Sequence, residues 1–379
     1  LRDITMKTTV AMLTYDGQKN KETIQMAARL IREGSLVAFP TETVYGLGAD
    51  ALNPQASQKI YAAKGRPSDN PLIVHISDME DLKKIALHIP PKAEKLAERF
   101  WPGPLTMIFE KGAAVPLETT GGLQTVAVRM PSHPIALALI REAGGFIAAP
   151  SANTSGRPSP TLAEHVAEDL EGRIPMILDG GPVGIGIEST IVDFTEAIPT
   201  VLRPGYITQE MLREAIGEVR MDPGLAQEQA EAGRNAAAGG VQGQAGNIRN
   251  AGNGGLRPKA PGMKYRHYAP KAELILVEGV QEQVQARINA LAQEGAADGK
   301  RIGIIATDET EGFYAAGIVK SIGARASEDS IARHLYGILR EFDQLGVDRI
   351  YSESFPSTGL GQAVMNRLLK AAGHQVIEA

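Results

Sequence analysis

SLVAFPTETVYGLG, residues 35–48, joins an apolar run to an unusually polar segment. The first five residues, SLVAF, predict a buried strand, because the run is short, continuous and apolar. The remainder, PTETVYGLG, has the proline and glycines of a loop, but a plain turn has little use for two threonines, a glutamate and a tyrosine. Two interpretations remain open: the loop binds a small polar ligand, or it is a solvated loop of unusual polarity.

The composition around this stretch is that of a globular protein. The chain has 379 residues, which exceeds the usual size of one domain and predicts two. Its hydrophobic content of 43% and charged content of 22% are ordinary for a soluble protein. The formal net charge of −5 argues against a protein that coats nucleic acid, although it leaves room for a local basic patch.

Cysteine is absent, which excludes disulfides, zinc ribbons and thiol nucleophiles and fits a reducing compartment. The first residues, LRDITMKTTVAML, lack the apolar centre of a signal peptide. No run approaches the roughly 18 consecutive apolar residues of a membrane span. We therefore expect a cytoplasmic protein with no membrane segment.

Apolar runs alternate with helical patterns over residues 21–218. Strands are predicted at 35–39, 71–77, 105–109, 125–130, 146–150, 176–181, 189–194 and 200–205. Helices are predicted at 22–34, 53–65, 91–100, 133–144 and 161–172. Because no helix separates the last two strands, we expect a twisted mixed sheet with helices packed on it rather than a purely parallel sheet.

The composition changes over residues 224–258, which are rich in Gly, Ala, Asn and Gln and nearly free of large apolar side chains. Such a segment cannot bury enough surface to offset its own ordering entropy, so it predicts a flexible linker. The α/β rhythm resumes at Ala272 and predicts a second, smaller, largely parallel domain of the Rossmann-like type. The expected division is 17–222 for the first domain, 223–270 for the linker and 271–379 for the second domain.

Two stretches of the first domain have side chains suited to anions. KGRP, residues 64–67, ends a predicted helix, and its two cations suit an oxygen cluster such as a triphosphate. Alternatively, cations at a helix C-terminus only complement its dipole. Strand 125–130 places Thr125 and Arg129 on one face, where the guanidinium could clamp a carboxylate. An edge-strand arginine in solvent is the other interpretation.

Two further loops are rich in hydroxyls. Residues 151–161 follow a predicted strand, where α/β proteins often place their sites, but Ser, Asn, Gly and Pro are also ordinary loop formers. GGPVGIGIEST, residues 180–190, is not a phosphate-binding Walker loop, because no Gly-Lys-Ser/Thr follows. GLGQA, residues 359–363, lacks the third glycine of a dinucleotide fingerprint and predicts the start of a helix, with a weak anion site as the alternative. His75 lies in an apolar strand, which favours a role in the core or the wall of a site.

Together these motifs resemble a known family. In chain order, PTETVYGLG, KGRP with NPL, WPGPLT, SANTSG with SPT, GIESTIVD and LRPG resemble the YrdC domain. PGMKYRHYAP, residues 261–270, and the domain after it are similar to the two-domain form of the threonylcarbamoyl-AMP synthase family. The Gly/Asn-rich stretch before PGMKYRHYAP has no match in that pattern and looks like an insertion in the linker.

The resemblance implies an enzyme that condenses L-threonine, bicarbonate and ATP to threonylcarbamoyl-AMP and pyrophosphate, for threonylcarbamoyl modification of tRNA. It implies Mg²⁺ with the ATP and no tightly bound organic cofactor. The product would pass to a tRNA threonylcarbamoyl transferase. Contact of the chain with tRNA or double-stranded RNA is a further expectation.

The resemblance also implies roles for individual residues. Those expected to stabilise the transition state are Lys64, Arg66 and Arg203. L-Threonine would contact Thr43, His75, Arg129, Ala149 and Ser189. ATP would contact Arg66, Asn70, Thr125, Ser151, Ser159 and Arg203. A lid would consist of Lys264, Tyr265 and Arg266, unless that segment is a rigid spacer. Glu42 and Glu188 are the nearest carboxylates, and whether either is a general base stays open.

An RNA-binding module on the same fold would need a basic surface, which the overall acidity disfavours. A carbamoyl transferase of the hydrogenase-maturation type would carry cysteine-rich zinc modules, and this chain has no cysteine.

Overall fold

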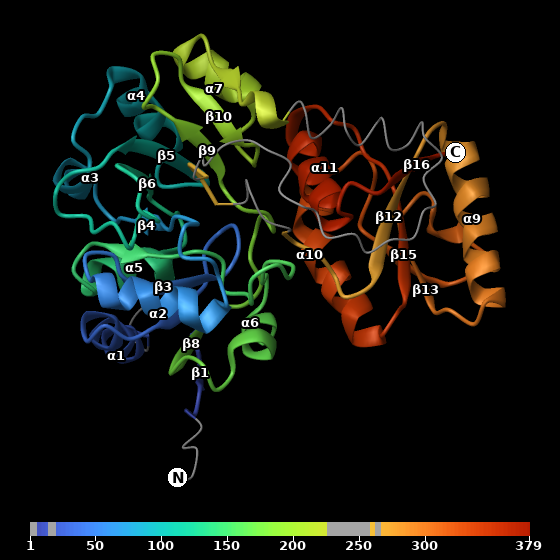
Figure 1. Cartoon of the computed structure of the whole chain (residues 1–379), viewed down its shortest axis with the longest axis horizontal. Helices are drawn as coiled ribbons and strands as arrows, with labels where there is room; N and C mark the ends of the chain where they lie inside the picture. The colour runs from blue at the N-terminus through green and yellow to red at the C-terminus, as the bar shows by residue number, and fades with distance from the viewer. Residues whose placement is uncertain (1–5, 14–19, 226–257, 262–266) are drawn as a thin grey trace.

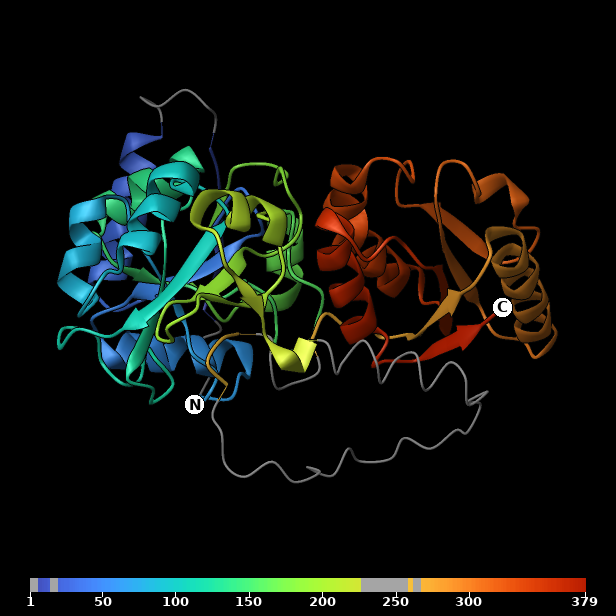
Figure 2. The same ribbon diagram turned by 90° about the horizontal axis from the view of Figure 1, so that it is seen from above.

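The computed structural model describes residues 6–13, 20–225, 258–261 and 267–379. They form two units side by side, each built on its own sheet, as Figures 1 and 2 show from two directions. The first sheet has eleven strands in the order β1-β8-β2-β3-β7-β4-β6-β5-β9-β10-β11, and the second has five in the order β14-β13-β15-β12-β16. No strand is shared between the two sheets within these residues.

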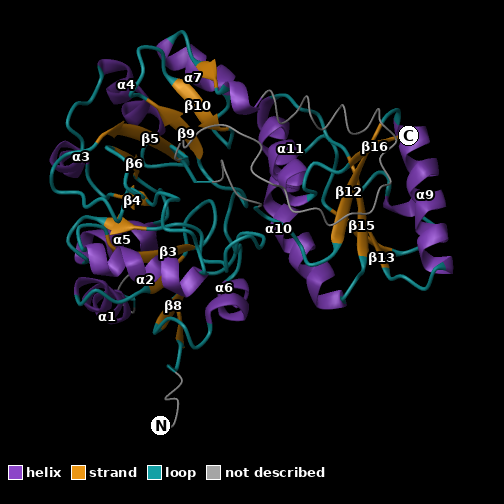
Figure 3. Cartoon of the chain, in the orientation of Figure 1, coloured by secondary structure: helices purple, strands orange, loops and turns teal. Residues whose placement is uncertain are grey.

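The first unit combines this long sheet with seven helices among the described residues (Figure 3). Its strands are β1 Thr9–Met12, β2 Val37–Phe39, β3 Gly46–Asp50, β4 Ile73–His75, β5 Leu105–Glu110, β6 Thr125–Arg129, β7 Ile147–Ala148, β8 Met176–Asp179, β9 Thr190–Asp193, β10 Thr200–Arg203 and β11 Arg220–Met221. Its helices are α1 Lys21–Arg32, α2 Pro54–Lys64, α3 Met79–Ile85, α4 Pro91–Phe100, α5 Pro134–Glu142, α6 Ala163–Leu170 and α7 Gln209–Ile216. The sheet contains parallel pairs such as β4 with β6 and antiparallel pairs such as β5 with β6, which confirms the predicted mixed sheet.

The opening stretch forms a tight antiparallel pair. β2 pairs with β3, with Phe39 opposite Gly46 and Val37 opposite Gly48, so the loop proper is the short polar link between these strands. The expectation of a loop over all of residues 40–48 is therefore wrong at its glycine end. The glycines permit close packing: a Cβ on Gly48 would lie 2.8 Å from Phe39 Cε1 and 2.9 Å from Ile147 Cγ2.

This packing predicts a stability effect of opposite sign at two glycines. Gly48→Ala should lower the free energy of unfolding by about 1–3 kcal/mol, because Phe39 and Ile147 are both fully buried and must shift. Gly337→Ala is the matched control, since a Cβ there meets nothing within 4 Å in a helix interior. It should stabilise by up to about 1 kcal/mol through helix propensity. Thermal unfolding of both variants checks this, and equal effects would contradict the packing explanation.

Capping explains where helix α2 begins and ends. The side chain of Asn53 accepts hydrogen bonds from the main-chain N–H groups of Gln55 and Ala56, with Pro54 in the first turn, as predicted. Gly65 ends the helix in the left-handed conformation at φ 61°. Helices α3 and α7 and strands β1, β3 and β11 were not predicted. All five elements are short. Helix α3 buries only Leu82 and Ile85, and helix α7 buries only Leu212 and Ile216, which is too few apolar residues to show a helical period in the sequence.

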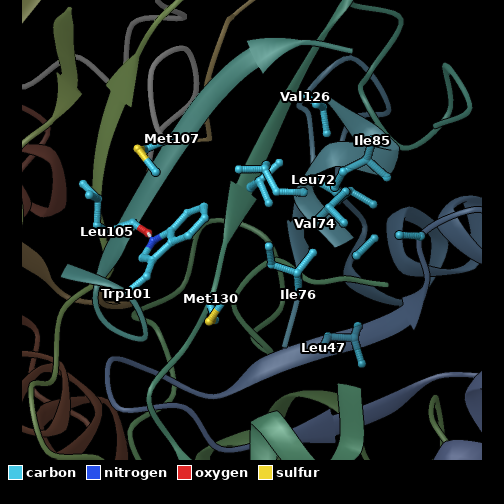
Figure 4. Close-up of a cluster of buried hydrophobic side chains, with 14 of the residues drawn as sticks. Leu47, Leu72, Val74, Ile76, Ile85, Trp101, Leu105, Met107, Val126 and Met130 are labelled. Atoms are coloured by element: carbon cyan, nitrogen blue, oxygen red, sulfur yellow. Dashed lines mark hydrogen bonds between the residues drawn. The ribbon is translucent and has the colours of Figure 1, made fainter. Parts of the chain in front are cut away.

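A large apolar cluster fills one side of the first sheet (Figure 4). The buried indole of Trp101 lies in it and donates a hydrogen bond from Nε1 to the carbonyl of Leu105 at 2.7 Å. Val126, Val128 and Met130 also belong to this cluster. Because side chains alternate along a strand, Arg129 on β6 faces the opposite side, as predicted.

The second unit is a parallel sheet covered on both faces. Its strands are β12 Glu273–Glu278, β13 Ile302–Ala306, β14 Ile318–Ser321, β15 Arg349–Glu353 and β16 Val376–Glu378, and every pairing among them is parallel. Helices α10 Glu328–Leu345 and α11 Gly359–Ala371 lie on the side that faces the first unit (Figures 1 and 2). Helix α9 Gln281–Ala297 covers the opposite face, and a 3₁₀ turn spans Glu311–Phe313. The GLGQA segment begins α11, as predicted. No helix in the described ranges has the length and apolar character needed to cross a membrane.

Candidate active site

Loops at the strand ends of the first unit and a segment leading to the second unit enclose a cavity. It is lined by Thr41, Thr43, Val44, Gly46, Arg66, Ile73, His75, Arg129, Ala149, Pro150, Ser151, Glu188, Ser189, Arg203, Pro261, His267 and Tyr268. Most of the site residues proposed from the sequence therefore come together in one place. The PTETVYGLG segment, residues 40–48, contributes Thr41, Thr43, Val44 and Gly46 to the wall.

Some of the expected residues do not line the cavity. Asn70 and Ser159 are buried beside it, and Lys64 lies behind it. Thr125 begins β6, four residues before Arg129, and so lies roughly 13 Å from it along the strand. The expected lid residues Lys264, Tyr265 and Arg266 lie outside the described residues.

Arg129 has the most distinctive environment. Its side chain is 5% exposed, and Nη1 donates to Thr43 Oγ1 at 2.9 Å. Nη2 forms an ion pair with Glu42 Oε1 at 2.7 Å, whereas Nε has no hydrogen-bond acceptor among the described residues. Buried donors are rarely left unsatisfied, so the unpartnered Nε of this guanidinium suits an acceptor such as the carboxylate of a ligand.

His75 is both packed in the interior and exposed to the cavity, so the two roles expected for it coexist. Its ring meets Phe39 edge-on with centroids 6.3 Å apart, and Nδ1 lies 3.1 Å from the carbonyl oxygen of Ile73. Burial, reinforced by the charge of Arg129, lowers the pKa of His75 to about 3. The imidazole is therefore neutral near pH 7 and can serve only as an uncharged hydrogen-bonding group.

The lowered pKa of His75 makes stability depend on pH. In the unfolded chain its pKa is near 6.5, so below that pH the unfolded state binds a proton that the folded state refuses. Stability is thus maintained above pH 6.5 and falls as the pH drops toward 3, by about 2 kcal/mol at pH 5 from this residue. Urea unfolding at pH 7.5 and 5.0 measures the loss of unfolding free energy between the two pH values. That loss should be about 2 kcal/mol smaller in His75→Gln than in the intact chain. His88→Gln, at an exposed position, is the control. If the unfolding free energy of His75→Gln depends on pH as strongly as that of the intact chain, His75 is not the source of the pH dependence.

Lys64 supports a loop of the site from behind. Its side chain is fully buried, and Nζ donates to the main-chain carbonyls of Ser151 and Asn153. Burial lowers the pKa of this amine well below its usual value. Ser151, held in this way, lines the cavity, and its hydroxyl donates to Asn153 Oδ1 at 2.5 Å.

Two guanidinium groups make the cavity wall cationic. Arg66 donates from Nη2 to the carbonyl of Pro71 at 3.1 Å, and burial lowers its pKa to about 10. Arg203 donates from Nε to the carbonyl of Ser189 at 3.0 Å and from Nη2 to the hydroxyl of the same residue at 3.2 Å. Both stay charged at neutral pH and favour an anionic ligand such as a polyphosphate.

Glu188, whose role the sequence left open, is held by three donors. Its carboxylate accepts from Ser159 Oγ at 2.5 Å, Tyr336 Oη at 2.9 Å and Arg367 Nε at 3.2 Å. Burial opposes ionisation of this carboxyl, but Arg367 and Arg203 outweigh it and hold its pKa below the usual value. A carboxylate so occupied is poorly placed to act as a general base.

Sequence reasoning missed the second unit's part in this site. Tyr336 and Arg367 lie on α10 and α11 and were not singled out. A signal was present for one of them: Arg367 follows Leu360 and Val364 at helical spacing, so an arginine falls on an otherwise apolar stripe. Such a residue indicates a buried partner elsewhere in the fold.

Comparisons with known proteins cover nearly the whole chain. Residues 29–205 match the Sua5/YciO/YrdC family model with the description "Telomere recombination", and residues 207–373 match "Threonylcarbamoyl-AMP synthase, C-terminal domain". Threonylcarbamoyl-AMP synthase from Bacillus subtilis is 51% identical over 366 residues, covering 96% of this chain and 97% of the relative. The protein of the same name from Pyrococcus abyssi is 49% identical over 355 residues, covering 94% of this chain and 95% of the relative.

A solved structure agrees in fold. Sua5 from P. abyssi complexed with L-threonine superimposes with a TM-score of 0.84 at 46% identity, covering 98% of this chain and 99% of that one. Both the sequence and the architecture of two units are thus shared over almost the full length. The chain belongs to the threonylcarbamoyl-AMP synthase family.

Proposed function

We propose that this chain condenses L-threonine, bicarbonate and ATP into threonylcarbamoyl-AMP and pyrophosphate, in the cavity described above. The observation that carries the proposal is the buried guanidinium of Arg129, which keeps an unpartnered Nε in a cavity that also holds Arg66 and Arg203. An amino-acid carboxylate and a polyphosphate are the two anions that such a site would take together.

In this proposal one end of the cavity binds L-threonine. Arg129 binds the carboxylate of the substrate. Thr43 orients the guanidinium of Arg129 through the hydrogen bond that its hydroxyl accepts from Nη1. Neutral His75 contributes a polar edge without a competing charge. Ala149 and Ser189 complete the pocket, because both line the same cavity.

ATP occupies the other side. Arg66, Ser151 and Arg203 line the wall that would face it. Asn70, Thr125 and Ser159 stay proposed as ATP contacts, although they lie outside the wall as described, so a contact would require the site to adjust. Lys64 acts on the nucleotide through the Ser151 loop, because its amine is occupied by that loop's carbonyls.

The reaction proceeds in two steps. The threonine amine combines with bicarbonate to form a carbamate and water. One carbamate oxygen then attacks the α-phosphorus of ATP, and the bond from that phosphorus to the bridging oxygen breaks to release pyrophosphate. Negative charge grows on the departing pyrophosphate, where Arg66 and Arg203 would stabilise it by preorganised electrostatics.

Magnesium is expected to accompany ATP, but the described residues of the cavity offer few ligands for it. Within the described ranges there is no cluster of three side chains of the metal-binding types. Glu188, the carboxylate that lines the cavity, is already bonded to three donors. A Mg²⁺ ion would therefore be held mainly by the phosphates themselves.

Several wider features belong to the same proposal. The chain is divided into 17–222, a linker at 223–270 and 271–379, in line with two sheets that share no strand. The product passes, in the cytoplasm, to a tRNA threonylcarbamoyl transferase, with tRNA contact by this chain as an additional element.

Pyrophosphate release tests the function directly. The intact chain with ATP and bicarbonate should release pyrophosphate only when L-threonine is added, and L-serine, which lacks the methyl group, should be a poorer substrate. Omitting bicarbonate should also suppress release. Binding of double-stranded RNA without threonine-dependent release would contradict the synthase and favour a binding module on the same fold.

A further inference from the structure

Helix α11 of the second unit reaches the main chain of the active-site loop. The side chain of Arg367 is fully buried, and its three nitrogens are directed at the first unit. Nε donates to Glu188 Oε2 at 3.2 Å, Nη2 to the Glu188 carbonyl at 3.3 Å, and Nη1 to the carbonyl of Pro204. One arginine thus bridges the loop that carries Glu188 and the segment after β10.

Helix α10 supplies a second donor to the same carboxylate. Tyr336 is fully buried, and its hydroxyl lies 2.9 Å from Oε2 and 3.1 Å from Oε1 of Glu188. Tyr268, a wall residue of the cavity, stacks on the ring of Tyr336 with centroids 5.3 Å apart. The contacts are therefore aimed at the cavity wall and not only at the outer surface of the first unit.

The residue after Glu188 shows why its position matters. Ser189 lines the cavity, and its hydroxyl is 2.7 Å from that of Thr106 and 3.2 Å from Arg203 Nη2. Arg203 also bonds the carbonyl of Ser189. A shift of Glu188 would move Ser189 and, through two hydrogen bonds, the guanidinium of Arg203.

We propose that Arg367 and Tyr336 are positioning residues for the reaction, which act through Glu188 to set Ser189 and Arg203 in the cavity. This inference rests on the proposed function and gives the second unit a role in it. Neither residue lines the cavity, so neither touches substrate. The alternative is that both merely join the two units, as other contacts across this interface do.

Variants of the full chain separate positioning from joining. Tyr336→Phe removes one hydroxyl, and Arg367→Lys keeps the charge while losing the planar fork. Two controls match them: Tyr351→Phe removes a hydroxyl from a buried tyrosine in the second unit, and Gln344→Ala removes a 2.6 Å bond across the interface to Glu168. Melting temperature and kcat/KM for L-threonine are measured for all of them.

We expect Tyr336→Phe to lower kcat/KM about tenfold, since a hydrogen bond to a charged group is lost. Arg367→Met should lower it about 10²-fold, since misplacement of reacting groups has effects of that size. Arg367→Lys should recover part of that loss, and both controls should stay within about twofold of the intact chain. If Arg367→Met fails to fold, Tyr336→Phe and Arg367→Lys still carry the test.

A double-mutant cycle supplies a readout that joining alone would not move. If Tyr336 acts through Glu188, then Tyr336→Phe should have little further effect in a Glu188→Gln background. Full multiplication of the two effects, or normal kcat/KM in Tyr336→Phe, would overturn the proposal. If the intact chain binds L-threonine but releases no pyrophosphate, the proposed function fails, and the dissociation constant for L-threonine replaces kcat/KM as the measure. A Tyr336→Phe variant that binds as tightly as the intact chain then overturns the positioning role.

Discussion

Arg129→Ala is expected to lower kcat/KM for L-threonine by about 10²–10³-fold, the cost of roughly 3–4 kcal/mol for removing one partner of a buried charge pair. The side chain is 5% exposed, so the substrate carboxylate would enter a site where water compensates little for the lost guanidinium. Threonine-dependent pyrophosphate release, measured at several threonine concentrations, provides the number. Binding of ATP alone should be retained, because Arg66 and Arg203 are untouched.

Two variants complete the test of the carboxylate clamp. Arg129→Lys keeps a positive charge but cannot form two parallel hydrogen bonds, so it should recover only part of the activity. Arg141→Ala changes an exposed arginine in the last turn of α5 and should have no effect on kcat/KM. A normal KM for threonine in Arg129→Ala would contradict the assignment. A simultaneous loss of ATP binding would instead indicate damage to the whole site.

Arg340→Met should produce the largest loss of stability, about 3–5 kcal/mol, because it leaves a buried carboxylate with fewer partners. Arg340 and Asp169 both have side chains with no exposed surface, and Nη2 of Arg340 lies 2.9 Å from Asp169 Oδ2 across the interface between the units. The same nitrogen donates to the carbonyl of Pro158 at 2.7 Å. Asp169 keeps Arg157 and the N–H of Thr154 as partners, which places the expected value toward the lower end.

Unfolding of Arg340→Met can be followed by two signals that distinguish the two units. Trp101 is the single tryptophan of the chain and is buried in the first unit, so its fluorescence follows that unit, while circular dichroism follows both. Arg349→Met is the control, because its ion pair with Glu273 is partly exposed within the second unit and should contribute less than about 1 kcal/mol. If Arg340→Met and Arg349→Met lower the free energy of unfolding equally, the buried ion pair across the interface stabilises the protein no more than the partly exposed one.

The sequence predicted the larger part of the fold. A run such as TVAVRM has its own period of two, and a segment such as PKAEKLAERF has its own helical period, so local pattern was enough to place β6 and α4. Mixed strand directions, the parallel second domain and the helix at GLGQA are likewise confirmed. The sequence pattern did not predict β3, because Gly46 and Gly48 lack the side chains that are typical of a strand. These glycines allow close packing against Phe39.

The sequence alone thus determined to which family the chain belongs, because short ordered motifs such as KGRP and GIESTIVD keep their identity without any knowledge of distance. Tertiary structure alone decided what each polar group faces. It turned the amine of Lys64 toward loop carbonyls, left Nε of Arg129 without an acceptor among the described residues and brought Arg367 from the second unit onto Glu188. Contacts between residues 179 positions apart arise from the packing of two sheets with their helices, and no local period of the chain encodes them.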